Sequence, residues 1–334
     1  GWVVARLTEN LAQVFQADPV VLNMPHRDTI RAEERGHGLT MLFAGDTDRL
    51  RGAFRQHQAY WLRNDRPPNR ETANGFRQQP SSEDGNVWTR FAPATVVGPR
   101  PGLRPATDDW PFLYLHHPMI PELSLNGMLV MGGLSLALLL LFTPGRNGPA
   151  ADFYFQSHMF CLGAGFMLIE TRAVVVMALL FGSTWAVNSV VLSGVLGMIL
   201  ASNALALWMS PRRLWINYVG VWSALSLGVL LPTNVFLGVA ALPRLAGSFL
   251  LVFGPVLFAG VIFALSLRQT VALHQAFGAN IAGAVFGGLA EYTSLLFGFR
   301  RLLIVAACFY ACSAVFFALS RSQRTVVALR TASP

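Results

Sequence analysis

Lysine is absent from this 334-residue sequence, and charged residues of every kind make up only 13% of it. Soluble domains usually contain about 25% charged residues, so the composition argues against a soluble globular fold for most of the chain. All 25 basic residues are arginine. The missing lysine is typical of a GC-rich coding bias and indicates no particular chemistry.

Cysteine is also scarce. Cys161, Cys308 and Cys312 all lie inside apolar stretches, where cysteine usually behaves as a small apolar residue. They therefore indicate neither a disulfide framework nor a thiolate metal site. A cleavable signal sequence cannot be recognised before the first polar segment, and the sequence starts with Gly1. We expect the chain to be the C-terminal part of a longer protein.

The net charge of +8 is divided unevenly. Residues 1–120 contain 14 arginines and 13 acidic residues, whereas residues 121–334 contain 11 arginines and only four acidic residues. Most arginines of the second part lie between or after apolar stretches, which is typical of the flanks of membrane spans. We expect the lipid bilayer as a partner, and no nucleic acid.

Long apolar stretches are abundant, and several exceed the roughly 18 residues that mark a spanning helix. Seven candidate spans follow Pro121, at 124–142, 157–181, 186–209, 215–231, 246–267, 273–297 and 300–319. The predicted fold class for residues 121–320 is an all-α polytopic membrane bundle of about seven transmembrane helices. Residues 321–334 are expected to form a polar tail. With five arginines expected near one face and seven near the other, the charge bias leaves the orientation open.

Residues 1–63 have the pattern of a small α/β segment. Apolar positions in 2–15 recur at helical spacing, and residues 20–22 and 38–44 are predicted strands. Asp46 is expected to cap a helix that reaches about Tyr60. About 60 residues are too few to bury a doubly wound core, so we expect the C-terminal remnant of a Rossmann-like domain.

Residues 64–120 are rich in proline, glycine and arginine and end in TDDWPFLYL. This composition is typical of a linker, so we expect little regular structure between residues 64 and 106.

Three stretches resemble one bacterial family: TDDWPFLYL at 107–115, GFMLIETRAVVVMALLFGSTWAVNSVV at 165–191, and GANIAGAVFGGLAEY at 278–292. They are similar to the multi-pass membrane proteins that carry a spermidine-synthase-like, polyamine aminopropyltransferase-like domain. The resemblance implies a location in the bacterial inner membrane. It also implies an aminopropyltransferase-like or methyltransferase-like catalytic half upstream of Gly1, as a partner that uses an S-adenosyl-type nucleoside.

A nucleotide-binding motif is not evident in the sequence itself. RGHG at 35–38 lacks the preceding strand, the third glycine and the acidic residue about 20 positions later that a dinucleotide-binding turn requires. We therefore expect this chain to hold no cofactor and not to be catalytic alone.

Glu170 and Arg172 place two charges inside a candidate span. A charge at the bilayer centre costs about 2.5–3.5 kcal/mol and is a functional candidate by default. Residues two apart on a helix point away from each other, so each charge needs another partner.

A second intramembrane feature is the four-residue repeat of Ala279, Gly283, Gly287 and Glu291. Its small residues permit close helix approach, and we expect Glu291 to face the bundle interior. We hypothesise that Arg172 bonds to Glu291 or to another interior acceptor.

The neighbouring polar groups of this candidate intramembrane site are expected to be Asn188, Asn203 and Asn280. Two interpretations are open: polar contacts that only fix helix packing, and a pathway for protons or small cations.

Asp108, Asp109 and Trp110 precede the first span. One interpretation places them at the mouth of an active site that binds a cationic amine; the other is a turn with aromatic anchors in the headgroup layer. His116 and His117 follow closely, but adjacent histidines on a loop rarely converge on one ion, and we predict no metal site.

His158 and His274 lie at the predicted span edges, where we expect interfacial residues and not ligands.

The predicted function is that of a membrane domain that anchors a transferase-like half. The alternatives are a transporter or channel-like bundle for a small cation such as a polyamine, and a purely structural anchor.

Overall fold

The computed structural model describes residues 1–33, 38–64, 87–97, 105–142, 150–231 and 233–331. The chain forms two compact units, Gly1–Pro118 and Met119–Pro334. It is mostly helical, with small strand pieces confined to the first unit.

The first unit has two helices and six short strands among its described residues. In chain order they are α1 (Trp2–Phe15), β1 (Val20–Met24), β2 (Thr29–Arg31), β3 (Leu39–Phe43), α2 (Asp48–His57), β4 (Tyr60–Asn64), β5 (Val87–Phe91) and β6 (Thr95–Val97). The helix predicted at 2–15 and the strands predicted at 20–22 and 38–44 are confirmed. The second helix begins at Asp48, with Thr47 at its N-cap, and ends before Tyr60.

The strands pair two by two. β1 is antiparallel to β3, β4 is antiparallel to β5, and β2 is parallel to β6. The described residues therefore contain no parallel sheet of the doubly wound kind. Val20, Leu22 and Phe54 form a small buried core, against which Phe91 packs.

Residues 87–97 correct the prediction that the region up to residue 106 has little regular structure. β5 and β6 pair with β4 and β2, which come much earlier in the chain. Such pairing depends on a distant strand, so local composition did not indicate it. Residues 65–86 and 98–104 of the predicted linker lie outside the described residues.

The second unit is a helical bundle. Its α-helices are α3 (Glu122–Phe142), α4 (Ala150–Phe181), α5 (Trp185–Trp208), α6 (Leu214–Leu230), α7 (Ala241–Leu267), α8 (Leu273–Ala290), α9 (Thr293–Phe297) and α10 (Phe299–Thr331). Each predicted apolar segment is helical over most of its length, but the one predicted at 273–297 is divided into α8 and α9. α10 continues to Thr331, so the expected polar tail at 321–334 is helical as far as Thr331.

Four described helices are long and apolar enough to cross a membrane: Ala150–Phe181, Trp185–Trp208, Leu242–Leu267 and Phe299–Arg324. Glu122–Leu138 and Leu214–Leu230 are shorter apolar helices. Large apolar side chains such as Leu200 and Trp208, which are 73% and 90% exposed, cover the outside of the bundle. Exposed apolar surface on this scale indicates a membrane protein.

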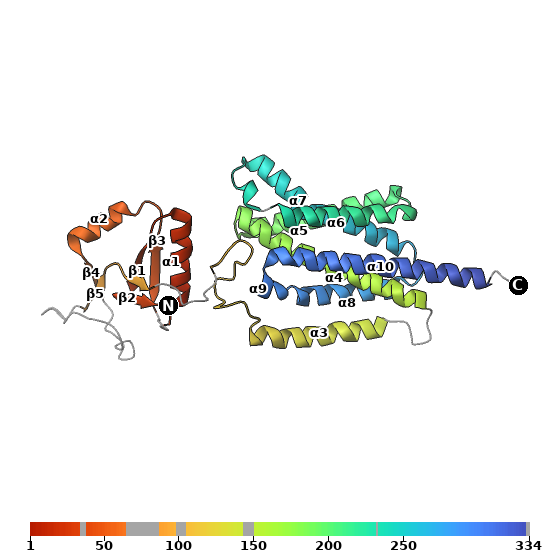
Figure 1. Ribbon diagram of the computed structural model, residues 1–334, viewed down its shortest axis with the longest axis horizontal. Helices are drawn as coiled ribbons and strands as arrows, with labels where there is room; N and C mark the ends of the chain where they lie inside the picture. The colour runs from red at the N-terminus through yellow and green to blue at the C-terminus, as the bar shows by residue number, and fades with distance from the viewer. Residues whose placement is uncertain (34–37, 65–86, 98–104, 143–149, 232, 332–334) are drawn as a thin grey trace. The chain divides into compact units, whose positions relative to one another are not determined.

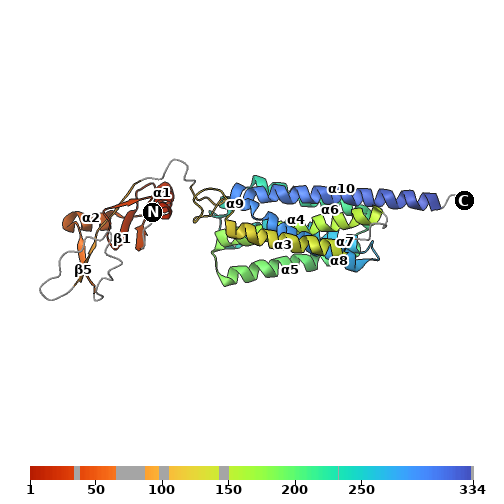
Figure 2. The ribbon, with the colours of Figure 1, turned by 90° about the horizontal axis from the view of Figure 1, so that it is seen from below.

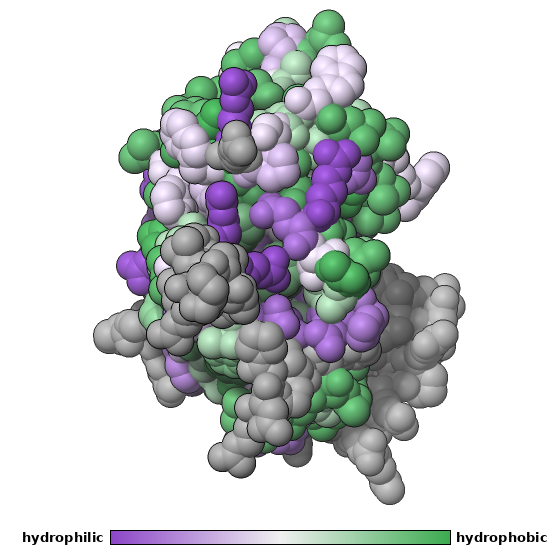
Figure 3. All heavy atoms as spheres, turned by 90° about the vertical axis from the view of Figure 1, so that its right-hand side faces the viewer, coloured by the Kyte–Doolittle hydropathy of each residue, from purple (hydrophilic) through white to green (hydrophobic). Residues whose placement is uncertain are grey.

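The helices run roughly antiparallel to their chain neighbours (Figures 1 and 2). α4 contacts α5, α7, α8 and α10, while α3 packs on α8 and α6 packs on both α7 and α10. Hydrophilic side chains gather on the end of the bundle where α10 finishes, with apolar residues around them (Figure 3). The exposed Arg213, Arg268, Arg321 and Arg324 belong to the segments at this end.

The small-residue face predicted on α8 is confirmed. A side chain on Gly283 would collide with the carbonyl oxygen of Phe160 on α4, and a Cβ on Gly287 would lie 2.5 Å from that of Ala164. Ala279 is buried on the same face. The backbones of α4 and α8 therefore approach closely because these positions lack side chains.

Candidate functional site

Arg172 points from α4 into the bundle and is 7% exposed. Its Nη2 donates to the carbonyl oxygen of Gly228 on α6 at 3.3 Å. A Cβ at Gly228 would lie 3.0 Å from Leu303, a tight contact, and 3.8 Å from Nη1 of Arg172, an ordinary van der Waals distance. The Gly228 carbonyl is therefore one interior acceptor of Arg172.

Glu291 lies directly after α8 and is half-buried. Its carboxyl group lies near the side chain of Thr171 on α4. The Thr171 hydroxyl donates to the carbonyl oxygen of Met167 at 2.9 Å. Glu170 is half-buried as well, and no hydrogen bond or ion pair joins it to the described residues.

The predicted asparagines do not gather around Arg172. Asn188 is exposed on α5. Asn280 donates to the carbonyl oxygen of Met159 at 3.0 Å and, with Asn203, lines a cavity whose α4 wall ends at Phe166. Six residues separate Phe166 from Arg172, or about 9 Å along a helix axis. The candidate polar residues therefore lie at different heights along the helix axes and do not form one site.

A buried hydrogen-bond network around His158 was not anticipated. His158 is fully buried and lies inside α4 because this helix begins at Ala150, two turns before the predicted span edge. Nδ1 lies 2.8 Å from Oγ of Ser313, and Nε2 lies 2.9 Å from Oγ of Ser266. The Tyr218 hydroxyl lies 2.8 Å from Oγ of Ser313. The four residues come from α4, α10, α7 and α6, and we call them the His158 network.

Neutral imidazole has one donor and one acceptor. Hydroxyl groups can take either role, so the His158 network can be satisfied without a charge. Serines and a tyrosine on separate helices share no spacing pattern with His158, and no sequence signal indicated that they would meet.

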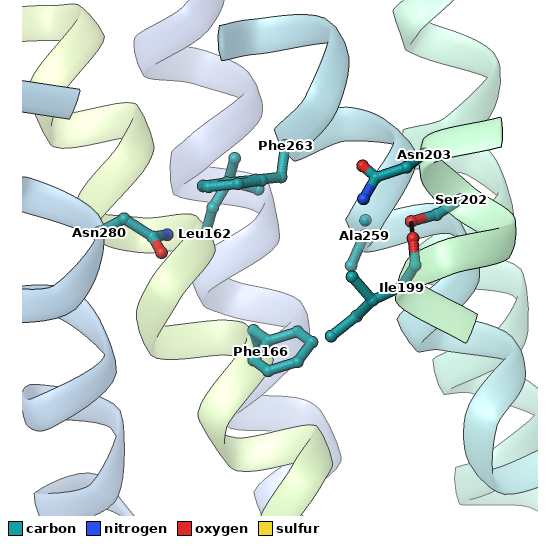
Figure 4. Close-up of a pocket in the computed structure, with 9 residues that line it drawn as sticks. Leu162, Phe166, Ile199, Ser202, Asn203, Ala259, Phe263 and Asn280 are labelled. Atoms are coloured by element: carbon teal, nitrogen blue, oxygen red, sulfur yellow. Dashed lines mark hydrogen bonds between the residues drawn. The ribbon is translucent and has the colours of Figure 1, made fainter. Parts of the chain in front are cut away.

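A cavity of about 220 Å³ lies between α4, α5, α7 and α8 (Figure 4). Leu162, Phe166, Ile199 and Phe263 form much of its apolar wall. Its polar lining consists of Ser202, Asn203 and Asn280. Every described lining residue is uncharged, so the cavity offers no counter-charge to an ion.

In the first unit, Arg6 holds the segment that directly follows the predicted active-site mouth at Asp108, Asp109 and Trp110. Arg6 is fully buried and donates to four backbone carbonyl oxygens, those of Phe112, Leu113, Leu115 and His116, at 3.3, 2.8, 2.6 and 3.0 Å. We call this arrangement the Arg6 clamp. Burial lowers the pKa of the Arg6 guanidinium from its ordinary value, but arginine stays protonated in proteins.

Trp110 is fully buried beside this clamp, with its ring centroid 5.5 Å from the Arg6 guanidinium. Its backbone N–H donates to Oγ1 of Thr107 at 3.1 Å. Trp110 is therefore a core residue and not an aromatic anchor at the headgroup layer. Asp108 is exposed and Asp109 is half-buried.

His116 packs edge-on against Trp2 at 5.5 Å between ring centroids, and its ring lies 5.9 Å from that of His117. Within the described ranges, no three histidine, cysteine or acidic side chains converge as metal ligands would.

Comparisons with known proteins give no relative. No family model matches the chain, and neither the curated proteins nor the solved structures include a significant match.

Proposed function

We propose that this chain is the membrane domain of a spermidine-synthase-like integral membrane protein, and that its bundle anchors a transferase-like catalytic half. The resemblance of residues 107–115, 165–191 and 278–292 motivates the family assignment. We further propose seven spans and a location in the bacterial inner membrane.

One observation carries the anchoring role: several interior polar side chains form separate bonds to neighbouring helices, and those of the His158 network bond, among the described residues, only to one another across four helices. Arg172 meets a carbonyl on α6, Asn280 meets one on α4, and Ser135 donates to that of Ala282 at 2.7 Å. Interhelical bonds of this kind contribute about 0.6 kcal/mol on average and up to about 1.7 kcal/mol. Dispersed contacts fix helix packing, whereas a cation pathway needs polar groups that line one continuous route.

Transport of a small cation is the second candidate function. Half-buried Glu170 and Glu291 favour it, because intramembrane carboxylates mark cation routes. The uncharged lining of the cavity argues against it.

The anchoring role can be tested with the full chain in two measurements. A fluorescent protein fused before Gly1 should stay in the membrane fraction after an alkaline carbonate wash. The purified chain in detergent should show no saturable binding of radiolabelled spermidine or S-adenosylhomocysteine in equilibrium dialysis.

Release of the fusion by the wash would contradict the anchoring role. Saturable spermidine binding that disappears in Glu291→Gln would replace it with cation transport. Asp108→Asn serves as the matched carboxylate control outside the bundle, and loss of spermidine binding in this variant alone would instead support the active-site-mouth interpretation.

A further inference from the structure

The cavity between α4, α5, α7 and α8 has a definite polar geometry. Asn203 and Asn280 lie on opposite sides and point their carboxamides inward, while Phe166 and Phe263 close two further sides (Figure 4). A ring contact between Phe263 and Phe277, with centroids 5.7 Å apart, joins α7 to α8 beside it.

Some of the polar groups that line the cavity can form further hydrogen bonds. The Asn203 carboxamide has no hydrogen bond to the described residues, and Asn280 uses one N–H for Met159. The Ser202 hydroxyl donates to the Ile199 carbonyl at 2.7 Å, so its oxygen can still accept. An amide without a partner in an apolar setting is unfavourable, and a ligand that bonds to it would remove this penalty.

Water alone is a poor occupant. A volume of about 220 Å³ has room for several waters, and each buried water needs two to four polar partners. The mostly apolar wall cannot supply them. A flat ring with polar atoms on opposite edges would contact the phenyl groups and both amides together.

The position of the cavity favours a ligand from the bilayer. Phe263 lies five residues before Arg268, or about 7.5 Å along α7. Arg268 is exposed and donates to the Ala206 carbonyl on α5 at 2.7 Å. Asn203 is exposed on α5, on whose outside Leu196 and Leu200 are 65% and 73% exposed. The cavity therefore opens towards an apolar surface, one to two turns inside the arginine-rich end.

We propose that this cavity binds the head-group ring of a lipid-soluble quinone. The two quinone carbonyls would accept hydrogen bonds from the carboxamides of Asn203 and Asn280, and the ring would lie between Phe166 and Phe263. The site binds a neutral molecule because no charged side chain lines its described part. This inference is independent of the proposed function.

The test is photolabelling of the purified full chain in lipid nanodiscs with an azidoquinone, with decylubiquinone as competitor. Peptide mapping reports the labelled site and so separates binding from partition into lipid. We expect labelling near residues 199–203 and 280, and its loss on addition of decylubiquinone.

Asn203→Leu should reduce the specific labelling about tenfold, the effect of one lost hydrogen bond. Ala259→Leu, which fills the cavity, should abolish it. The matched control is Asn188→Leu, an exposed asparagine on the same helix, which should label like the unsubstituted chain. Asn203→Leu should keep the thermal midpoint, since it removes no internal bond.

Labelling that is spread over the chain, that decylubiquinone does not compete, or that Asn203→Leu leaves unchanged would overturn the proposal. Competition by spermidine would overturn it too, since it would show a cation site. Should Ala259→Leu not fold, Asn203→Leu decides alone.

Discussion

At the scale of single residues, the Arg6 clamp shows how one charge can order a loop that has no regular structure. Carbonyl groups in an irregular segment lack the partners that a helix or sheet provides. Four of them, between Phe112 and His116, use the same guanidinium. The segment that precedes α3 is therefore a folded part of the first unit and not a free linker.

Replacing Arg6 with methionine should release this segment. Hydrogen bonds to a charged group contribute about 1.5–3 kcal/mol, so we expect chymotryptic cleavage after Tyr114, which is 80% exposed, to become at least about tenfold faster. Arg90→Met is the control, because its ion pair with Asp28 is partly exposed and contributes less than about 1 kcal/mol. Because arginine stays protonated, the cleavage rate of the unsubstituted chain should be independent of pH once the pH dependence of the protease itself is subtracted.

Equal cleavage rates for Arg6→Met and Arg90→Met would show that the Arg6 clamp does not order this segment.

The His158 network is the second residue-scale feature, and it joins four helices by hydrogen bonds. A double-mutant cycle with His158→Phe and Tyr218→Phe should give a coupling energy of about 0.5–1.5 kcal/mol. The reason is that either substitution disturbs the hydrogen bonding of Ser313. The measurement is reversible unfolding in mixed detergent micelles.

Tyr154→Phe is the matched control for this cycle. Tyr154 stacks on Phe316 at 6.4 Å between centroids, and its hydroxyl has no hydrogen bond to the described residues. This substitution should change the unfolding free energy little. Strict additivity of His158→Phe and Tyr218→Phe would show that the two side chains act separately.

At the scale of elements, glycine on α8 determines how closely α4 and α8 approach. Gly283→Ala should lower the unfolding free energy by about 1–3 kcal/mol, because the new methyl group collides with the Phe160 carbonyl and the helices must separate. Gly288→Ala on the same helix meets nothing within 4 Å. It should be neutral or slightly stabilising, since alanine favours helix by up to about 1 kcal/mol over glycine.

Unfolding free energies of the two variants in the same micelles test this difference. If both variants were equally stable, close α4–α8 approach would not contribute to the fold.

At the scale of the whole bundle, the number of helices that cross the bilayer determines which loops face the same side. With seven spans, α6 and α7 both cross between Arg213 and Arg268, so these two positions face the same side. α8 crosses before Arg300, which then faces the other side. If only the four long apolar helices crossed, α7 alone would separate Arg213 from Arg268, and the two would face opposite sides.

Single cysteines at positions 213, 268 and 300, in a chain whose Cys161, Cys308 and Cys312 are alanine, distinguish these topologies. We expect an impermeant maleimide to label 213 and 268 from one face of sealed vesicles and 300 from the other. Labelling of 268 and 300 from one face, with 213 on the other, would support four spans.

The sequence alone determined the helices of the bundle, because a long apolar stretch forms a helix in lipid wherever its neighbours lie. The repeat at Ala279, Gly283 and Gly287 also predicted a close helix contact correctly, since it is a property of one helix face. Strands β1 and β3 were also predicted correctly, from short local runs of β-branched and apolar residues.

Only the tertiary structure decided which side chains meet. His158 and Ser313 are 155 positions apart, and their contact depends on where α4 and α10 cross. The same holds for the Arg6 clamp and for the cavity between Asn203 and Asn280. The hydropathy of a stretch specifies that it is helical and which solvent it prefers, whereas a polar contact or a cavity depends on helix crossings that no single stretch encodes.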